Sequence, residues 1–141
     1  MGIFAKMFGS QPEYPELETD TAAAGQLKAI RGHLEKLARE VSDPLEVVPG
    51  ENGGYVFIGK PPKRFGIAWI EGDEVKSFKS LMAEHNLSAQ TINRVSDELR
   101  EAYQHHQEAD RYRATIAERD VVITPSEPLA MEVREILSRL N

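Results

Sequence analysis

Apolar residues recur at helical spacing in two long stretches of the chain. In residues 21–41 the steps alternate between four and three residues, which is typical of a helix that packs along another helix. The same alternation runs through residues 88–118 and predicts a second, longer helix of roughly 45 Å at ~1.5 Å per residue. Its periodic positions, here called the long-helix seam, are Ile92, Val95, Leu99, Ala102, His106, Ala109, Arg113 and Ile116.

Two shorter helices are predicted from capping residues followed by apolar periodicity. Asp73 suits the N-cap of a helix over residues 74–85, and Ser126 suits the N-cap of a last helix. Asn86 can end the first of these, because asparagine tolerates the left-handed conformation. The inward positions expected in the first are Val75, Phe78, Leu81 and Met82, and in the second Leu129, Val133, Ile136, Leu137 and Leu140.

The period changes to that of β-strands in the middle of the chain. Residues 45–48, 55–59 and 65–70 are short runs rich in β-branched and aromatic residues, separated by segments with glycine and proline. They predict a three-stranded antiparallel meander, and residues 120–124 predict a fourth strand. The expected fold class is α+β: a small antiparallel β-meander packed with helices, in the order α-β-β-β-α-α-β-α, with one long protruding helix.

The first nine residues form a separate amphipathic pattern. Ile3, Phe4, Met7 and Phe8 fall on one side of a short helix, and Gly9 ends it. Residues 11–20 contain two prolines, four acidic residues and no cation, which favours an extended linker. The expected organisation is an amphipathic N-terminal peptide with an acidic linker over residues 1–20, followed by a single α+β domain over residues 21–141.

Composition narrows the classes of function. The chain of 141 residues has no cysteine, which excludes disulfides, thiolate metal sites and cysteine nucleophiles. The absence of cysteine also suits the reducing cytoplasm, where we expect the protein. No apolar run approaches the roughly 18 residues needed to span a bilayer. The formal net charge of −6 opposes general binding to nucleic acid or anionic lipid.

The two helices expected on either side of Asn86 form a distinct motif. The second opens with the sequence SAQTINRV, with Ser88 as its N-cap. Residues 78–97 resemble the helix-turn-helix of bacterial repressors of the lactose-repressor type. Asn86 takes the place of the turn glycine, and the apolar residues that match the buried positions are Leu81, Leu87, Ile92 and Val95.

This resemblance implies a sequence-specific DNA-binding protein. In such repressors the second helix enters the major groove, where glutamine pairs with adenine and arginine with guanine or phosphate. By position, Ser88, Gln90 and Arg94 would contact DNA, with Asn93 exposed beside them. Residues 73–101 carry two more acidic than basic side chains, which disfavours DNA. The alternative interpretation is a capped corner between packed helices.

Two other groups of polar residues are candidate sites. His105 and His106 project about 100° apart around a helix, so they cannot share a metal ion without other ligands, and His106 is expected to pack on the seam. Lys60, Lys63 and Arg64 form the only basic island, which suits a phosphate or an acidic partner surface, or else is a solvated hairpin loop. No motif predicts a catalytic residue, a metal or a cofactor.

The N-terminal peptide suggests a protein partner. Burying its four large apolar side chains would contribute roughly 6–12 kcal/mol, and ordering about eight backbone residues costs about 1–2 kcal/mol each. The two terms nearly cancel, so a preformed groove on a partner would decide whether the peptide binds. The alternative acceptors are its own domain and, more weakly, a membrane surface.

The leading functional hypothesis is a non-enzymatic adaptor or accessory subunit. It would bind another protein through the N-terminal peptide and the long-helix seam, and the seam could also form a homodimer. The residues expected at the partner are Ile3, Phe4, Met7, Phe8, Leu99 and His106. The second hypothesis is DNA binding through residues 78–97, and the third is a small enzyme with an unrecognised site.

Overall fold

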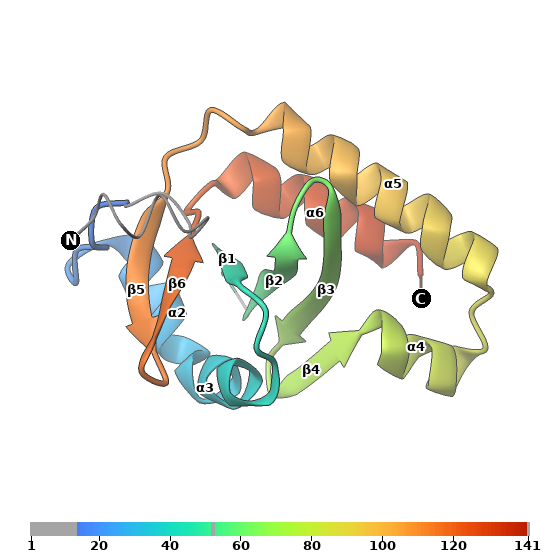
Figure 1. Cartoon of the computed structure of the whole chain (residues 1–141), viewed down its shortest axis with the longest axis horizontal. Helices are drawn as coiled ribbons and strands as arrows, with labels where there is room; N and C mark the ends of the chain where they lie inside the picture. The colour runs from blue at the N-terminus through green and yellow to red at the C-terminus, as the bar shows by residue number, and fades with distance from the viewer. Residues whose placement is uncertain (1–13, 52, 141) are drawn as a thin grey trace.

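The computed structural model describes residues 14–51 and 53–140. Its helices are α2 (Ala22–Ala29), α3 (Arg31–Glu40), α4 (Phe78–His85), α5 (Ala89–His105) and α6 (Glu127–Ser138). Its strands are β1 (Leu45–Gly50), β2 (Gly53–Lys60), β3 (Arg64–Glu71), β4 (Glu74–Ser77), β5 (Tyr112–Ile116) and β6 (Arg119–Ile123). Along the described chain the order is α-α-β-β-β-β-α-α-β-β-α (Figure 1).

The strands form one six-stranded sheet in the order β4-β3-β2-β1-β6-β5. Strands β1 to β4 are a continuous antiparallel meander, and β5 and β6 are an antiparallel hairpin. Strand β6 returns beside β1 in the parallel direction, with Glu46 opposite Val122 and Val47 opposite Ile123. The α+β class is confirmed, but the sheet is mixed and has two strands more than the four expected.

Helices cover both faces of this sheet, because successive residues of a strand point to opposite sides. Val47 and Val56 face the core formed with α2 and α3, whereas Val48 and Phe57 face the core formed with α5 and α6. Helices α5 and α6 lie side by side (Figure 1). The body therefore has two hydrophobic cores, separated by the sheet.

The helix expected over residues 21–41 is present but divided. Thr21 caps α2 by accepting a hydrogen bond from the N–H of Ala24 (3.1 Å). Ile30 leaves the helical conformation, with φ −113° and ψ 13°. Its side chain is buried in the core formed with α2 and α3. The division lets α2 pack on β1 and β2 while α3 packs on β5.

Residues 74–85 begin as a strand, not as a helix. Gly72, with φ 59°, lets the chain turn back, and residues 74–77 then pair with β3. Ser77, not Asp73, is the N-cap of α4. Its hydroxyl accepts from the N–H of Ser80 (3.2 Å), and the hydroxyl of Ser80 accepts from the N–H of Ser77 (2.9 Å).

The inward positions expected in this stretch are half correct. Leu81 is buried and Phe78 is half-buried, and both contact the core around α5 and α6. Val75 and Met82 are instead each 45% exposed. Val75 lies on β4, an edge strand of the sheet, where fewer neighbouring residues cover it.

The long helix ends at His105, not near Glu118. Its buried side packs on α6 and the sheet through Val95, Leu99, Ala102 and Tyr103. The chain then forms a loop and β5, which reaches β6 through a two-residue turn whose members, Ala117 and Glu118, have φ of 52° and 66°. The last three seam positions lie in this loop and strand: Ala109, Arg113 and Ile116.

The segment before α2 covers the outer edge of β5. The N–H of Leu17 donates to the C=O of Arg113 (2.9 Å), and the N–H of Arg113 donates to the C=O of Pro15 (2.9 Å). The guanidinium of Arg113 also donates to the C=O of Tyr14 (3.1 Å), and Leu17 is buried. Residues 14–17 therefore belong to the folded body, although they lie within the range expected to be a linker.

Candidate functional site

A carboxylate on α6 joins the two histidines at the end of α5. Glu132 Oε2 lies 3.1 Å from His105 Nδ1, and Glu132 Oε1 lies 3.0 Å from His106 Nε2. An ionised carboxylate only accepts hydrogen bonds, so each of these ring nitrogens carries the hydrogen. Partial burial raises the pKa of Glu132, but the hydrogen bonds from His106 and His105 outweigh it and bring the pKa below its usual 4.5.

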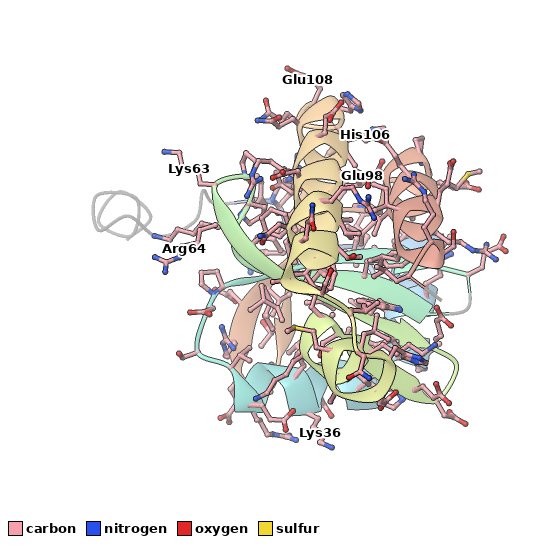
Figure 2. All side chains as sticks on the ribbon, turned by 90° about the vertical axis from the view of Figure 1, so that its right-hand side faces the viewer. Lys36, Lys63, Arg64, Glu98, His106 and Glu108 are labelled. Carbon is pink, nitrogen blue, oxygen red and sulfur yellow. The ribbon has the colours of Figure 1, made fainter. Side chains whose placement is uncertain are left out.

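Beside this contact lies an acidic groove of about 240 Å³ between α5 and α6. Its lining residues are Glu98, Glu101, His105, Glu132, Glu135, Ile136 and Arg139. Figure 2 shows Glu98 and His106 on the side of α5 that faces α6. Four carboxylates against one guanidinium give this lining a net negative charge, which attracts cationic groups. Within residues 14–51 and 53–140, however, there is no group of three or more histidine, aspartate or glutamate side chains that could hold a metal ion.

A second polar cluster lies inside the protein, between the sheet and the end of α5. Glu46 on β1 is 7% exposed, and its carboxylate accepts three hydrogen bonds. The donors are the hydroxyl of Tyr103 (2.7 Å), the hydroxyl of Thr124 (2.6 Å) and Nε of Arg111 (3.0 Å). A buried charge is tolerated when it is paired and hydrogen-bonded, and Glu46 meets both conditions.

The same cluster fastens the loop that follows α5. Arg111 donates to the C=O of Gln107 and of Ala109, at 3.0 Å each, and its guanidinium lies 5.2 Å from the ring centre of Tyr103. Burial, followed by the nearby Glu46 carboxylate, raises the pKa of Tyr103 well above its ordinary 10. This cluster was not predicted from the sequence. The available signal was one acidic residue inside the apolar run of β1.

The corner between α4 and α5 has the caps that the sequence predicts. Asn86 adopts the left-handed conformation, with φ 52° and ψ 39°, and the hydroxyl of Ser88 accepts from the N–H of Thr91 (3.1 Å). Of the four positions that the motif buries, Leu81 and Val95 are buried, whereas Leu87 and Ile92 are only half-buried. The four residues that the resemblance assigns to the DNA side are exposed: Ser88, Gln90, Asn93 and Arg94. This face is accessible, and DNA binding itself stays a prediction.

The seam of α5 is not a free surface. Leu99 is 0% exposed and lies in the core with α6. The expected contact of Leu99 with a partner does not fit this burial, because the side chain already packs inside its own domain. His106 is half-buried and is held by Glu132, so it also differs from a simple apolar contact.

The basic island forms an exposed turn between β2 and β3. Lys60, Lys63 and Arg64 are all exposed, and Figure 2 shows Lys63 and Arg64 on the side of α5 away from α6. Arg100 on α5 holds the turn by donating to the C=O of Pro62 (2.6 Å). The three residues lie together as the sequence indicates, and anion binding there stays a prediction.

The apolar N-terminal residues Ile3, Phe4, Met7 and Phe8 lie outside the described residues. No family model, no curated protein and no solved structure matches the chain. Among the helices of the described part, none is both long and apolar enough to cross a membrane. Fold and sites thus define an α+β protein in which a mixed sheet lies between two helical layers.

Proposed function

We propose that this protein is a non-enzymatic adaptor or accessory subunit that binds another protein through the apolar side of residues 3–8. The supporting observation is that the described residues bury nearly all of their large apolar side chains, fully or in part. In residues 14–51 and 53–140, only Val75, Met82 and Met131 are exposed large hydrophobic residues. Because the seam of α5 is used in the protein's own core, the N-terminal peptide is the better candidate for an apolar partner contact.

The anchoring of residues 14–17 limits where such a partner can lie. Residues 9–13 are the only connection between residues 3–8 and Tyr14, and five residues span at most about 18 Å. A bound partner would therefore lie near the outer side of β5. A hollow of about 420 Å³ lies there, lined by Tyr14, Pro15, Gln107, Ala109, Asp110, Arg111 and Tyr112.

Replacing the two phenylalanines tests the proposal. In the full chain, Phe4→Ser with Phe8→Ser should leave the thermal midpoint almost unchanged and abolish capture of the partner from the native host. Met131→Ser is the matched control, because Met131 is an exposed apolar residue of the body (64%), and it should retain capture. A large fall in the midpoint of the phenylalanine variant would show instead that the peptide belongs to the protein's own core.

A photocrosslinking side chain tests the location. Placed at Gln107, beside the hollow, it should label the captured partner, whereas the same group at Lys36 on α3 should not. Both positions are exposed, so folding should be unaffected. Equal labelling from the two positions would contradict a partner held near β5.

DNA binding is the second candidate, because the left-handed Asn86 and the exposed Gln90, Asn93 and Arg94 support it. Selection from a random duplex pool at low salt should then yield a preferred sequence. Arg94→Ala should weaken binding to it, and affinity should fall steeply with salt as counterions are released. If no sequence is enriched, this candidate is eliminated.

A further inference from the structure

The two edges of the sheet differ in how they are covered. The outer edge of β5 carries residues 14–17, whereas β4, at the other end of the sheet, has no second neighbouring strand within the described residues (Figure 1). An uncovered edge strand offers backbone donors and acceptors to another strand. Strand β4 is therefore where the described sheet can be extended.

One residue of β4 offers backbone groups for this purpose. Glu71 and Glu74 flank a two-residue turn and form a hydrogen-bonded pair, and the type of pair then alternates along the strands. Val75 and Ser77 therefore direct their N–H and C=O away from β3. Both groups of Ser77 are engaged by the hydroxyl of Ser80, at 2.9 Å each. This leaves the N–H and C=O of Val75, beside a side chain that is 45% exposed.

The residues on either side of Val75 carry opposite charges. Lys76 Nζ lies 3.6 Å from Glu71 Oε2 and 3.9 Å from Glu74 Oε2, and these carboxylates are 59% and 74% exposed. Lys76 itself is half-buried, but ion pairs with such exposed carboxylates are weak, so its ammonium can exchange them for another carboxylate.

This charge pattern complements itself in one orientation. In an antiparallel pair of identical strands centred on Val75, Glu74 of each copy lies opposite Lys76 of the other. A parallel pair in register would place like charges opposite each other, which destabilises a sheet. The pattern therefore fits a second copy in the antiparallel direction.

We propose that β4 pairs with β4 of a second copy of this chain, antiparallel and centred on Val75, so that two sheets become continuous. Each Val75 N–H donates to the C=O of the other Val75, and a Glu74–Lys76 pair lies on either side of these two hydrogen bonds. The contact is short, so the association is weak and depends on protein concentration. It goes beyond the adaptor function and does not involve residues 3–8.

Reversing one charge at a time tests this pairing. Glu74→Lys and Lys76→Glu each place like charges opposite each other in a pair of identical chains, and each should weaken self-association by about tenfold or more. An equal mixture of the two variants should restore it, because lysine at 74 then faces glutamate at 76, and lysine at 76 faces glutamate at 74. Glu108→Lys is the control for net charge, since Glu108 is exposed beyond the end of α5, and it should associate like the natural chain.

The measurement is the sedimentation coefficient over a concentration series, with the thermal midpoint confirming that each variant is folded. The series is repeated with Phe4→Ser and Phe8→Ser present, to exclude association through the N-terminal peptide. The proposal is overturned if the natural chain stays monomeric at its highest soluble concentration. It is equally overturned if the single variants associate as strongly as the parent, or if the mixture associates no better than they do. These results leave partner capture untouched, because capture is measured separately.

Discussion

Tyr103→Phe removes one hydroxyl from the buried cluster around Glu46 and leaves the aromatic ring in place. The ring keeps its edge-to-face contact with Phe57, with 5.3 Å between ring centres, and its contact with Arg111. The substitution therefore isolates the 2.7 Å hydrogen bond to the Glu46 carboxylate. A hydrogen bond to a charged group contributes about 1.5–3 kcal/mol, and we expect the free energy of unfolding to fall by about that amount.

Glu46→Ala removes the acceptor itself and should cost more. Three donors then lose their partner, and the side chain of Arg111, which is 9% exposed, is left without an opposite charge. Removing one partner of a buried ion pair destabilises a protein by about 3–5 kcal/mol. Glu46→Ala should therefore destabilise the protein more than Tyr103→Phe does.

Urea unfolding followed by the fluorescence of Trp69 measures these differences. Trp69 is the only tryptophan and is 3% exposed, so its emission reports the opening of the core. Thr124→Val and Thr115→Val are a matched pair, because Thr124 is buried and donates to Glu46 whereas Thr115 is exposed. The first should cost about 1.5–3 kcal/mol and the second less than about 0.5 kcal/mol. If Tyr103→Phe and Thr124→Val both cost as little as Thr115→Val, the stabilising role of the Glu46 cluster would be refuted.

Substitutions test three further features. Glu132→Gln should destabilise the protein most above pH 4.5. The pKa of Glu132 is lowered in the folded protein, so its stabilising contribution is present above pH 4.5 and is lost as the pH falls through the lowered pKa. A difference in thermal midpoint between the two proteins that does not shrink in acid would contradict this. Gly53→Ala should severely lower the urea midpoint, since its Cβ would lie 1.7 Å from a backbone oxygen of β3. Gly25→Ala is the control, because its Cβ meets nothing within 4 Å, and it should stabilise the protein by about 0.5–1 kcal/mol. Similar effects of the two substitutions would argue against the close approach of Gly53 to β3. Ala117→Asn and Glu118→Gly should each raise the thermal midpoint, because asparagine and glycine adopt positive φ at lower cost; a fall in both would show that the turn is not strained.

The first three strands of the meander, β1 to β3, could be predicted because composition and turn residues agree there. The β5–β6 hairpin lacks the second signal, since its turn is Ala117-Glu118 and contains neither glycine nor asparagine. Tyr112, Ala114 and Ile116 do alternate with polar residues, as a strand requires. The spacing of Ile116 also continues the helical period, however, and the two patterns compete over the same few residues.

The candidate sites divide in a similar way. The exposed face at the start of α5 follows from local spacing and caps, both of which the sequence contains. The contact between Glu132 and the histidines does not, because it joins residues 26 and 27 positions apart on two helices. Only the packing of α6 against α5 brings them together. Glu46 lies between these cases, since a lone acid in an apolar strand signals a buried partner without identifying it.

The end of α5 explains why one apolar period predicted a single helix where the protein has two elements. Leu99 packs in the core with α6, whereas Ile116 packs in the core with α2 and α3, on the other face of the sheet. A straight helix cannot reach both faces, so the chain must leave the helix between them. The contacts of Glu132 and Glu46 lie at that point, and Arg111 fixes the loop that crosses to β5. We infer that these polar contacts fix the position where α5 ends. The apolar spacing continues unchanged through the loop, so its earlier positions pack in the core with α6 and its last position, Ile116, packs in the core with α2 and α3.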